Sequence, residues 1–137
     1  MTLKDLLKDE EGFRSKPYRC TAGKLTIGYG RNLEDRGITK EEAEYLLDND
    51  IKAAISACRE TFAWFAFLDN VRQAVVCDMV FNLGIGGFLE FKKAIAAIRE
   101  KNWEKAADEM KDSDWYKQVR KRAVQLTVMM RTGRFEK

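Results

Sequence analysis

The stretch EEGFRSKPYRCTAGKLTIGYG, residues 10–30, decides the predicted fold, because the sequence pattern changes twice within it. It opens at the end of a predicted helix, which Thr2 caps and Gly12 ends. Further along, aliphatic and aromatic residues flank a turn at residues 21–24, a pattern typical of a β-hairpin. Beside this turn lies a cysteine, Cys20, in a chain that contains no histidine. What that thiol does is the functional question.

Beyond the hairpin, the spacing of apolar residues predicts helices to the end of the chain. The sequence TKEE at residues 39–42 is a capping box and opens a helix of about twenty residues. Asp69 is predicted to cap an almost entirely apolar helix that ends at the glycines of residues 84–87. Three further helices are expected, at residues 88–101, 103–111 and 114–131, the last closed by Gly133. The predicted fold class is therefore α+β and predominantly helical.

Length and composition indicate one ordered globular domain, with 137 residues, 45% of them hydrophobic, and one proline. Residues 1–11 are too charged for a signal peptide or a membrane anchor, so we expect neither export by a conventional route nor stable membrane association. The three cysteines cannot all pair with one another, which favours free thiols and a reducing compartment. Cys58 and Cys77 have apolar neighbours and are expected in the core. We expect no metal and no cofactor.

Glu11 is the first candidate catalytic residue, because it ends the first helix where polar hairpin side chains follow. A partly buried carboxylic acid can keep its proton near neutral pH and deliver it to the leaving oxygen of a glycosidic bond. A second group must then attack the anomeric carbon or steer a water from the other side. Taken alone, a glutamate at a helix end is more often structural than catalytic.

The order of motifs extends this reading. The segments EGFRSKPY and LTIGYGRN, with the cysteine between them, resemble the T-even type of phage lysozyme, glycoside hydrolase family 24. Five later segments resemble family segments in the same order, so the likeness covers nearly the whole chain: GITKEEAEYLLDND, VCDMVFNLGIGGF, NWEKAADEM, SDWYKQVRKRA and RTGRF. In that family a Glu, an Asp nine residues later and a Thr six residues after that form the catalytic set. The matching positions here are Glu11, Cys20 and Thr26.

The resemblance implies a lysozyme-like fold of two lobes within a single domain, residues 1–137. A small antiparallel β-hairpin lobe is expected at about residues 13–45, and a long connecting helix at about 40–60. The helical C-terminal lobe is expected at about 61–137, packed with the helix of residues 1–11. The chain is shorter between Leu33 and Gly37 than the T-even type, so the hairpin lobe should be trimmed.

The resemblance also implies an enzyme that cleaves the β-1,4 bond between N-acetylmuramic acid and N-acetylglucosamine in peptidoglycan. Glu11 would be the general acid, and the Thr26 hydroxyl would hold the water or orient the second group. The same matching places Asn32, Phe81 and Asn82 in substrate binding. It makes Arg122 an ion-pair partner of Glu11, and it pairs Arg31, where relatives carry histidine, with Asp50.

Cys20 departs from the family, which commonly has aspartate there, although some members have cysteine. An ordinary thiol, with a pKa of about 8.5, is mostly neutral at pH 7, so either nearby arginines lower that pKa or the step needs only a polarisable nucleophile. A thiolate nucleophile would give retention at the anomeric carbon, and a water-activating group would give inversion. A third alternative is a bystander thiol in a catalytically weakened peptidoglycan-binding module.

As an endolysin of phage or prophage origin, the protein is expected to be a monomer. It would stay in the host bacterial cytoplasm until a holin opens the membrane, and would then act on the periplasmic cell wall. Residues 113–137 carry seven Lys or Arg against two acids within a net charge of +3. This segment is either a solvated helix face or a surface for an anionic partner. A nucleic-acid binder would leave Glu11 unexplained, and no nucleic acid partner is expected.

Overall fold

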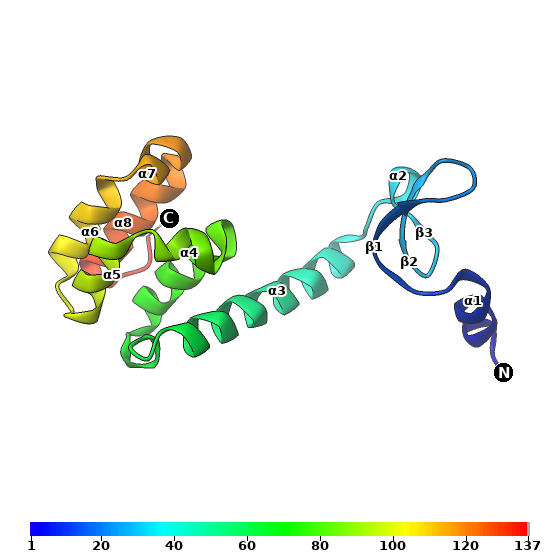
Figure 1. The fold of residues 1–137 in the computed structure, drawn as a ribbon, viewed down its shortest axis with the longest axis horizontal. Helices are drawn as coiled ribbons and strands as arrows, with labels where there is room; N and C mark the ends of the chain where they lie inside the picture. Colours follow the sequence, from blue (N-terminus) through cyan, green and yellow to red (C-terminus); the bar gives the residue numbers. More distant parts are fainter. Residues whose placement is uncertain (137) are drawn as a thin grey trace. The chain divides into compact units, whose positions relative to one another are not determined.

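The computed structural model describes residues 1–136 and divides into two compact units, Met1–Leu46 and the chain from Leu47 onward (Figure 1). The first unit holds a three-stranded antiparallel sheet, and the second is helical. The predicted fold class, α+β and predominantly helical, is confirmed. The packing of the first helix on the helical lobe concerns both units and stays a prediction.

Helix α1 (Leu3–Glu11) begins and ends where the sequence predicts. The Asp5 backbone N–H donates to the Thr2 hydroxyl at 3.1 Å, and the Thr2 N–H donates to the Asp5 carboxylate at 3.0 Å. This reciprocal capping box satisfies N–H groups that have no partner inside the helix. Gly12 ends the helix with a φ of +68°, and its N–H donates to the Lys8 carbonyl.

The sheet has the strand order β1 (Arg14–Arg19), β2 (Leu25–Gly28) and β3 (Arg31–Asn32), all antiparallel. The predicted hairpin is the β1–β2 pair. The third strand was not predicted, because two residues are too few to show alternation. In the central strand β2, Thr26 lies opposite Asn32. Thr26 is thus fixed between two neighbouring strands.

A four-residue helix that the sequence did not reveal, α2 (Leu33–Arg36), follows β3 directly. Asn32 caps it, because its side-chain oxygen accepts the Asp35 N–H at 3.0 Å. The Asn32 side-chain amide also donates to the Asp35 carboxylate at 3.0 Å. Helix α2 is thereby tied to the last residue of the sheet.

Helix α3 (Lys40–Thr61) confirms the predicted helix of about twenty residues and its capping box. The Thr39 N–H donates to Glu42 Oε1 at 2.8 Å, and the Glu42 N–H donates to Thr39 Oγ1 at 3.1 Å. The helix begins in the first unit and ends in the second.

The second unit packs its helices around one apolar core. Its elements after α3 are η1 (Phe65–Phe67), α4 (Asn70–Leu89), α5 (Lys92–Arg99), α6 (Trp103–Lys111), α7 (Asp114–Val119) and α8 (Lys121–Thr132). The largest side chains that are completely buried are Phe65, Phe88, Met79, Ile98, Met110 and Met130. Across residues 1–136, no single helix is long and apolar enough to cross a bilayer; α4 and α5 satisfy that test only as a pair bent by 105°.

Two boundaries in the second unit correct the prediction. The predicted stop at residues 84–87 is confirmed at Gly84, whose φ of +75° and ψ of 167° interrupt α4, but a short helical segment that was not predicted follows it to Leu89. The next helix accordingly starts at Lys92 instead of residue 88. The single helix predicted at residues 114–131 is two helices, α7 and α8, because Arg120 has a φ of +51°. Helix α6 and the Asp69 cap are confirmed.

Candidate active site

Cys20 lies where strand β1 enters the turn to β2. Its backbone N–H donates to the Lys24 carbonyl at 3.0 Å, and its own carbonyl accepts the Gly23 N–H at 2.8 Å. The side chain is half-buried. The thiol therefore belongs to a closed, hydrogen-bonded turn.

The amides of this turn act on the thiol. The Lys24 backbone N–H, followed by that of Ala22, lowers the pKa of Cys20, and the Thr26 hydroxyl adds to this, while desolvation opposes it. A lower pKa increases the fraction of thiolate at neutral pH. Backbone hydrogen bonds, and not the nearby arginines that the sequence analysis offered as one alternative, lower the pKa of this thiol.

Thr26 is buried, with 3% of its surface exposed. Its hydroxyl donates to the Lys24 carbonyl at 2.8 Å, which fixes the side chain beside the Cys20 turn. A hydroxyl has one proton, so Thr26 donates either to this carbonyl or to the Cys20 sulfur at any one time, while its oxygen can still accept a hydrogen bond. The structure thus brings Cys20 and Thr26 together, as the matched positions predict.

Glu11 lies directly against the turn between β2 and β3. Its Oε2 atom is 2.6 Å from the point where a Cβ on Gly30 would stand, so a larger residue at position 30 would force the Glu11 side chain to move. Gly30 also has a φ of +71°, which favours glycine independently. The first unit therefore places the carboxylate of Glu11 against the same sheet that carries Thr26 and Asn32.

Arg31 has a partner that the sequence analysis missed. Its guanidinium donates to both carboxylate oxygens of Glu42, at 2.9 and 2.5 Å, and also to the Gly37 carbonyl at 3.0 Å. This bond, followed by the Thr39 N–H, lowers the pKa of Glu42 to about 2. Glu42 lies three residues after the cap Thr39 in the capping box that the sequence shows, and this box was the signal from which Glu42 could have been identified. The predicted partner, Asp50, lies in the second unit, so that pair stays a prediction.

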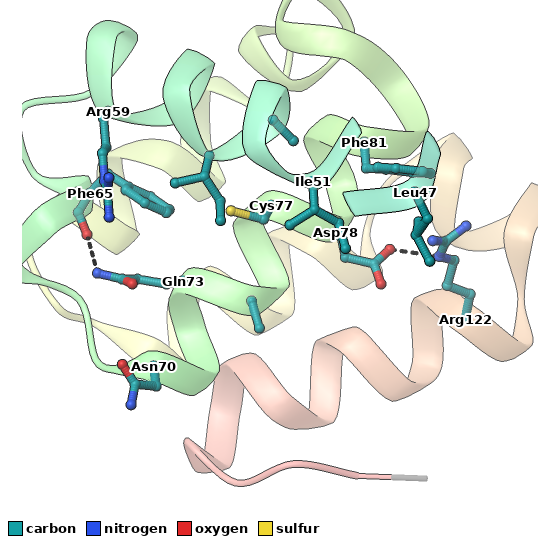
Figure 2. Close-up of a pocket in the computed structure, with 13 residues that line it drawn as sticks. Leu47, Ile51, Arg59, Phe65, Asn70, Gln73, Cys77, Asp78, Phe81 and Arg122 are labelled. Atoms are coloured by element: carbon teal, nitrogen blue, oxygen red, sulfur yellow. Dashed lines mark hydrogen bonds and ion pairs between the residues drawn. The ribbon is translucent and has the colours of Figure 1, made fainter. Parts of the chain in front are cut away.

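In the second unit, Phe81 and Arg122 line a pocket of about 450 Å³ (Figure 2). Figure 2 shows them at one end of the pocket, with Arg59 at the other. Within this unit Arg122 is paired with Asp78, whose Oδ1 accepts its Nε–H at 2.6 Å. No sequence signal pointed to Asp78. The predicted pair of Arg122 with Glu11 would join the two units and stays a prediction.

Asn82 lines a different cavity, of about 700 Å³, together with Trp115. Neighbouring helical residues point about 100° apart, which explains why Phe81 and Asn82 face different cavities. The Trp115 indole N–H is buried and has no acceptor among residues 1–136. A shared saccharide groove for Phe81 and Asn82 stays a prediction.

The other two cysteines differ from each other. Cys58 is completely buried, as predicted, whereas Cys77 is half-buried and lines the 450 Å³ pocket. Cys77 packs against the apolar core, as expected, but it is only partly buried because it also faces the pocket. Within residues 1–136, no three His, Cys, Asp or Glu side chains form a group that could hold a metal ion.

Acids of other helices engage part of the basic C-terminal segment. Arg131 bonds to Glu104 and to Asp108, the latter at 2.9 Å, while Arg122 bonds to Asp78. These pairs remove positive charge from the surface that a nucleic acid would need. Both interpretations of the segment, a solvated helix face and a surface for an anionic partner, stay predictions.

One family model and three similar proteins bear on this site. The sequence model of the phage lysozyme family matches residues 8–132, which include Glu11, Cys20 and Thr26. "Probable T4-type lysozyme 1" of Dictyostelium discoideum is 30% identical over 96% of this chain and 95% of its own length. An "Endolysin" of Acyrthosiphon pisum secondary endosymbiont phage 1 is 40% identical over 61% of this chain and 58% of its own. "Pre-baseplate central spike protein Gp5" of Enterobacteria phage T4 is 27% identical over 99% of this chain, but over 28% of that protein.

Proposed function

The chain belongs to the phage lysozyme family, and from this premise we propose that it cleaves the β-1,4 bond between N-acetylmuramic acid and N-acetylglucosamine in bacterial peptidoglycan. At the coarser level, membership makes it a glycosidase-type hydrolase whose substrate is peptidoglycan. The observation that best supports the finer proposal is local: Cys20 adjoins Thr26 in the sheet against which Glu11 lies.

Glu11 is the proposed general acid. In the protonated state it gives its proton to the glycosidic oxygen as the bond to the anomeric carbon breaks, so the leaving sugar departs as a neutral alcohol. Its carboxyl group occupies the space that a Cβ on Gly30 would take, beside the sheet that carries Thr26. Proton transfer requires this acid within hydrogen-bond reach of the glycosidic oxygen.

Cys20 is the proposed second group, and two mechanisms are open to it. As a thiolate it attacks the anomeric carbon, forming a carbon–sulfur bond that water then cleaves with Glu11 as base, and the product keeps its configuration. As a base it takes a proton from a water that attacks directly, and the configuration inverts. The anomer formed first, observed by NMR, distinguishes the two.

Thr26 is proposed to hold the reacting water or the thiol in position. Its buried, hydrogen-bonded hydroxyl has the rigidity that such a task requires. Other residues are proposed in supporting roles by their matched positions. Substrate contacts are assigned to Asn32, Phe81 and Asn82, and ion pairs to Arg122, Arg31 and Asp50.

In biological terms we propose an endolysin for host lysis. The similar phage endolysin supports this assignment. The protein would act as a monomer, accumulate in the bacterial cytoplasm and reach the wall through a lesion made by a holin. Active enzyme in the periplasm of cells that express this gene alone would refute the dependence on a holin.

A second candidate function is peptidoglycan binding without turnover. The observation that favours it is Cys20 itself, since a thiol stands where the family commonly has a carboxylate. Against it, no apolar side chain replaces Glu11 or Thr26, and the turn lowers the pKa of the thiol.

One experiment separates these candidates. Purified peptidoglycan in suspension is treated with the parent protein, with Glu11→Gln and with Glu10→Gln, the adjacent helix carboxylate, as matched control. For an enzyme, Glu11→Gln should lose activity by about 100-fold or more, and Glu10→Gln should not. A sedimentation assay on the same wall material measures binding. Binding by a parent protein that releases no fragments would establish the binding module and refute the enzyme.

A further inference from the structure

A single carboxylate oxygen connects the two ends of the turn that carries Cys20. Arg19 immediately precedes Cys20, and its Nη1 donates to Glu34 Oε1 at 2.8 Å. Leu25 begins the next strand, and its backbone N–H donates to the same oxygen at 3.0 Å. Glu34, on the short helix α2, thus connects the entry of the turn to its exit.

Two further bonds hold the turn from the same side. Arg19 Nη1 also donates to the Gly23 carbonyl inside the turn, at 3.0 Å. Lys24 Nζ lies 3.4 Å from Asp35 Oδ1, the neighbouring carboxylate of α2. Helix α2, which carries Glu34 and Asp35, is in turn attached to the sheet, because Asn32 caps this helix and pairs with Thr26.

We propose that Glu34, acting together with Arg19, is a positioning residue that fixes the turn of residues 20–24 so that its backbone amides point at the Cys20 thiol. For catalysis, this inference rests on the proposed role of Cys20. Glu34 bonds to Arg19 and to Leu25 at the ends of the turn and acts on the thiol only through the turn. Glu34 is therefore not assigned any chemical step.

Backbone amides of the turn are the groups that act most strongly on the thiol. The amides of Lys24 and Ala22 are the main cause of the lowered pKa of Cys20, and a side-chain substitution does not remove a backbone amide. Their effect depends on direction, because a hydrogen bond weakens steeply as its angle closes. The side chains that hold the turn therefore control the ionisation of the thiol.

The direction in which the pKa of Cys20 shifts when the charge of Glu34 is removed tests this inference. The charged side chains around the turn are Arg19, Lys24, Glu34 and Asp35. Removing the negative charge of Glu34 would, by Coulomb's law alone, favour the thiolate and lower the pKa of Cys20. If Glu34 positions the amides, the same substitution raises that pKa. The two explanations therefore predict opposite shifts.

The pair is exposed, and this also favours a local role. The side chains of Arg19 and Glu34 are 65% and 38% exposed, and exposed ion pairs contribute little to the free energy of unfolding. Substitutions here should leave the fold intact. A change in thiol ionisation then reports on the turn and not on general unfolding.

The test measures the alkylation rate of Cys20 by iodoacetamide as a function of pH. The proteins are the parent, Glu34→Ala, Glu34→Gln and the control Glu44→Gln, which changes an exposed carboxylate on α3. Trypsin cleaves after Arg19 and Lys24, so Cys20 is released in a short peptide. Mass spectrometry then distinguishes its modification from that of Cys58 and Cys77.

In Glu34→Ala the midpoint of the pH profile should rise, and alkylation at pH 7 should be about twofold to fivefold slower, as loss of an exposed ion pair implies. Glu34→Gln keeps an oxygen for the Leu25 N–H and should show a smaller rise. Glu44→Gln should match the parent. Should Glu34→Ala not fold, the Gln variant provides the same test.

A midpoint in Glu34→Ala that is unchanged, or lower than in the parent, would overturn the inference. So would a loss of thermal stability with an unchanged profile, which indicates a purely structural residue. The catalytic premise is tested separately: if Cys20→Ala lyses walls as fast as the parent, the proposed function of Cys20 fails, while the alkylation profile still decides the role of Glu34. If Cys20 is catalytic, Glu34→Ala should lower kcat and leave KM unchanged.

Discussion

The two units of this molecule are held together in different ways. Among residues 1–46, Thr26 is the one fully buried residue, and the structure depends on caps, turns and ion pairs. From residue 47 onward, apolar side chains of α3 to α8 form a packed core around Phe88 and Met79. Hydrogen bonds thus hold the candidate catalytic residues in position, whereas hydrophobic burial stabilises the helical unit. Substitutions in the first unit should therefore change activity more than stability, and substitutions in the core of the second unit should mainly lower the free energy of unfolding.

The sharpest test of this contrast is Cys20. Cys20→Ala should reduce lysis by about 100-fold or more while changing the free energy of unfolding by less than about 0.5 kcal/mol, because the side chain lies at a half-exposed turn. Cys20→Ser should be severely impaired, and Cys20→Asp, which restores the common family residue, should keep substantial activity. Turbidity of wall suspensions and thermal unfolding are the two measurements. Parent-like lysis by Cys20→Ala would leave Glu11 to act with Thr26 and water alone.

The opposite signature is expected in the helical core. Phe88 is completely buried, with ring centroids 5.5 Å from Phe62 and 6.2 Å from Phe91. Phe88→Ala should lower the free energy of unfolding by about 3–5 kcal/mol, through lost burial and the cavity it leaves. Urea denaturation followed by circular dichroism measures this. Phe67→Ala, at a residue 77% exposed, is the matched control and should cost little. Equal losses in the two variants would contradict the assigned core.

The ion pair of Arg31 and Glu42 should make the stability of the first unit depend on pH. Arg31, followed by the Thr39 N–H, depresses the pKa of Glu42 from 4.5 to about 2. A depressed carboxyl pKa gives stability that is complete above the unfolded value and is lost as pH falls toward the folded value. The difference in Tm between the parent and Glu42→Gln should therefore be constant above about pH 5 and shrink between about pH 4.5 and 2. A difference that does not change with pH would show that the pair is not formed in solution.

The smallest expected effect concerns Arg120, the break between α7 and α8. Its φ of +51° is unfavourable for a residue with a Cβ. Arg120→Gly should raise the free energy of unfolding by about 0.5–1 kcal/mol, whereas Arg120→Ala keeps the Cβ and should give no such gain. Thermal unfolding of the three proteins measures the difference. Equal stability of the Gly and Ala variants would place the residue in ordinary helical conformation.

Local signals explain what could be predicted from the sequence. Thr2, Thr39 and Asp69 were identified as caps because a cap requires only residues three or four positions apart. The break at Arg120 was missed because neither glycine nor proline marks it. Gly84 does interrupt the helix as predicted, but the helical segment that follows it to Leu89 was missed. Tertiary packing determines both outcomes, and it is invisible to local patterns.

The candidate site was predictable to a smaller degree. Glu11, Cys20 and Thr26 were proposed through family resemblance, because they belong to different elements of the fold and no local pattern links them. The partners of the charged residues, Glu42 for Arg31 and Asp78 for Arg122, come from side-chain geometry within each unit. The backbone amides that act on Cys20 carry no sequence signal at all, since every residue except proline has one.

The missing side chain of Gly30 affects how mutational maps of this protein should be read. Any larger residue there would meet the carboxylate of Glu11 and would also have to adopt a positive φ. In a saturation library scored by wall lysis, every substitution at residue 30 should therefore be lost alongside those at Glu11. Gly30 has no group that could donate, accept or attack. A residue that such a library ranks as essential can thus take no part in the chemistry and matter only because it leaves room for a neighbouring side chain.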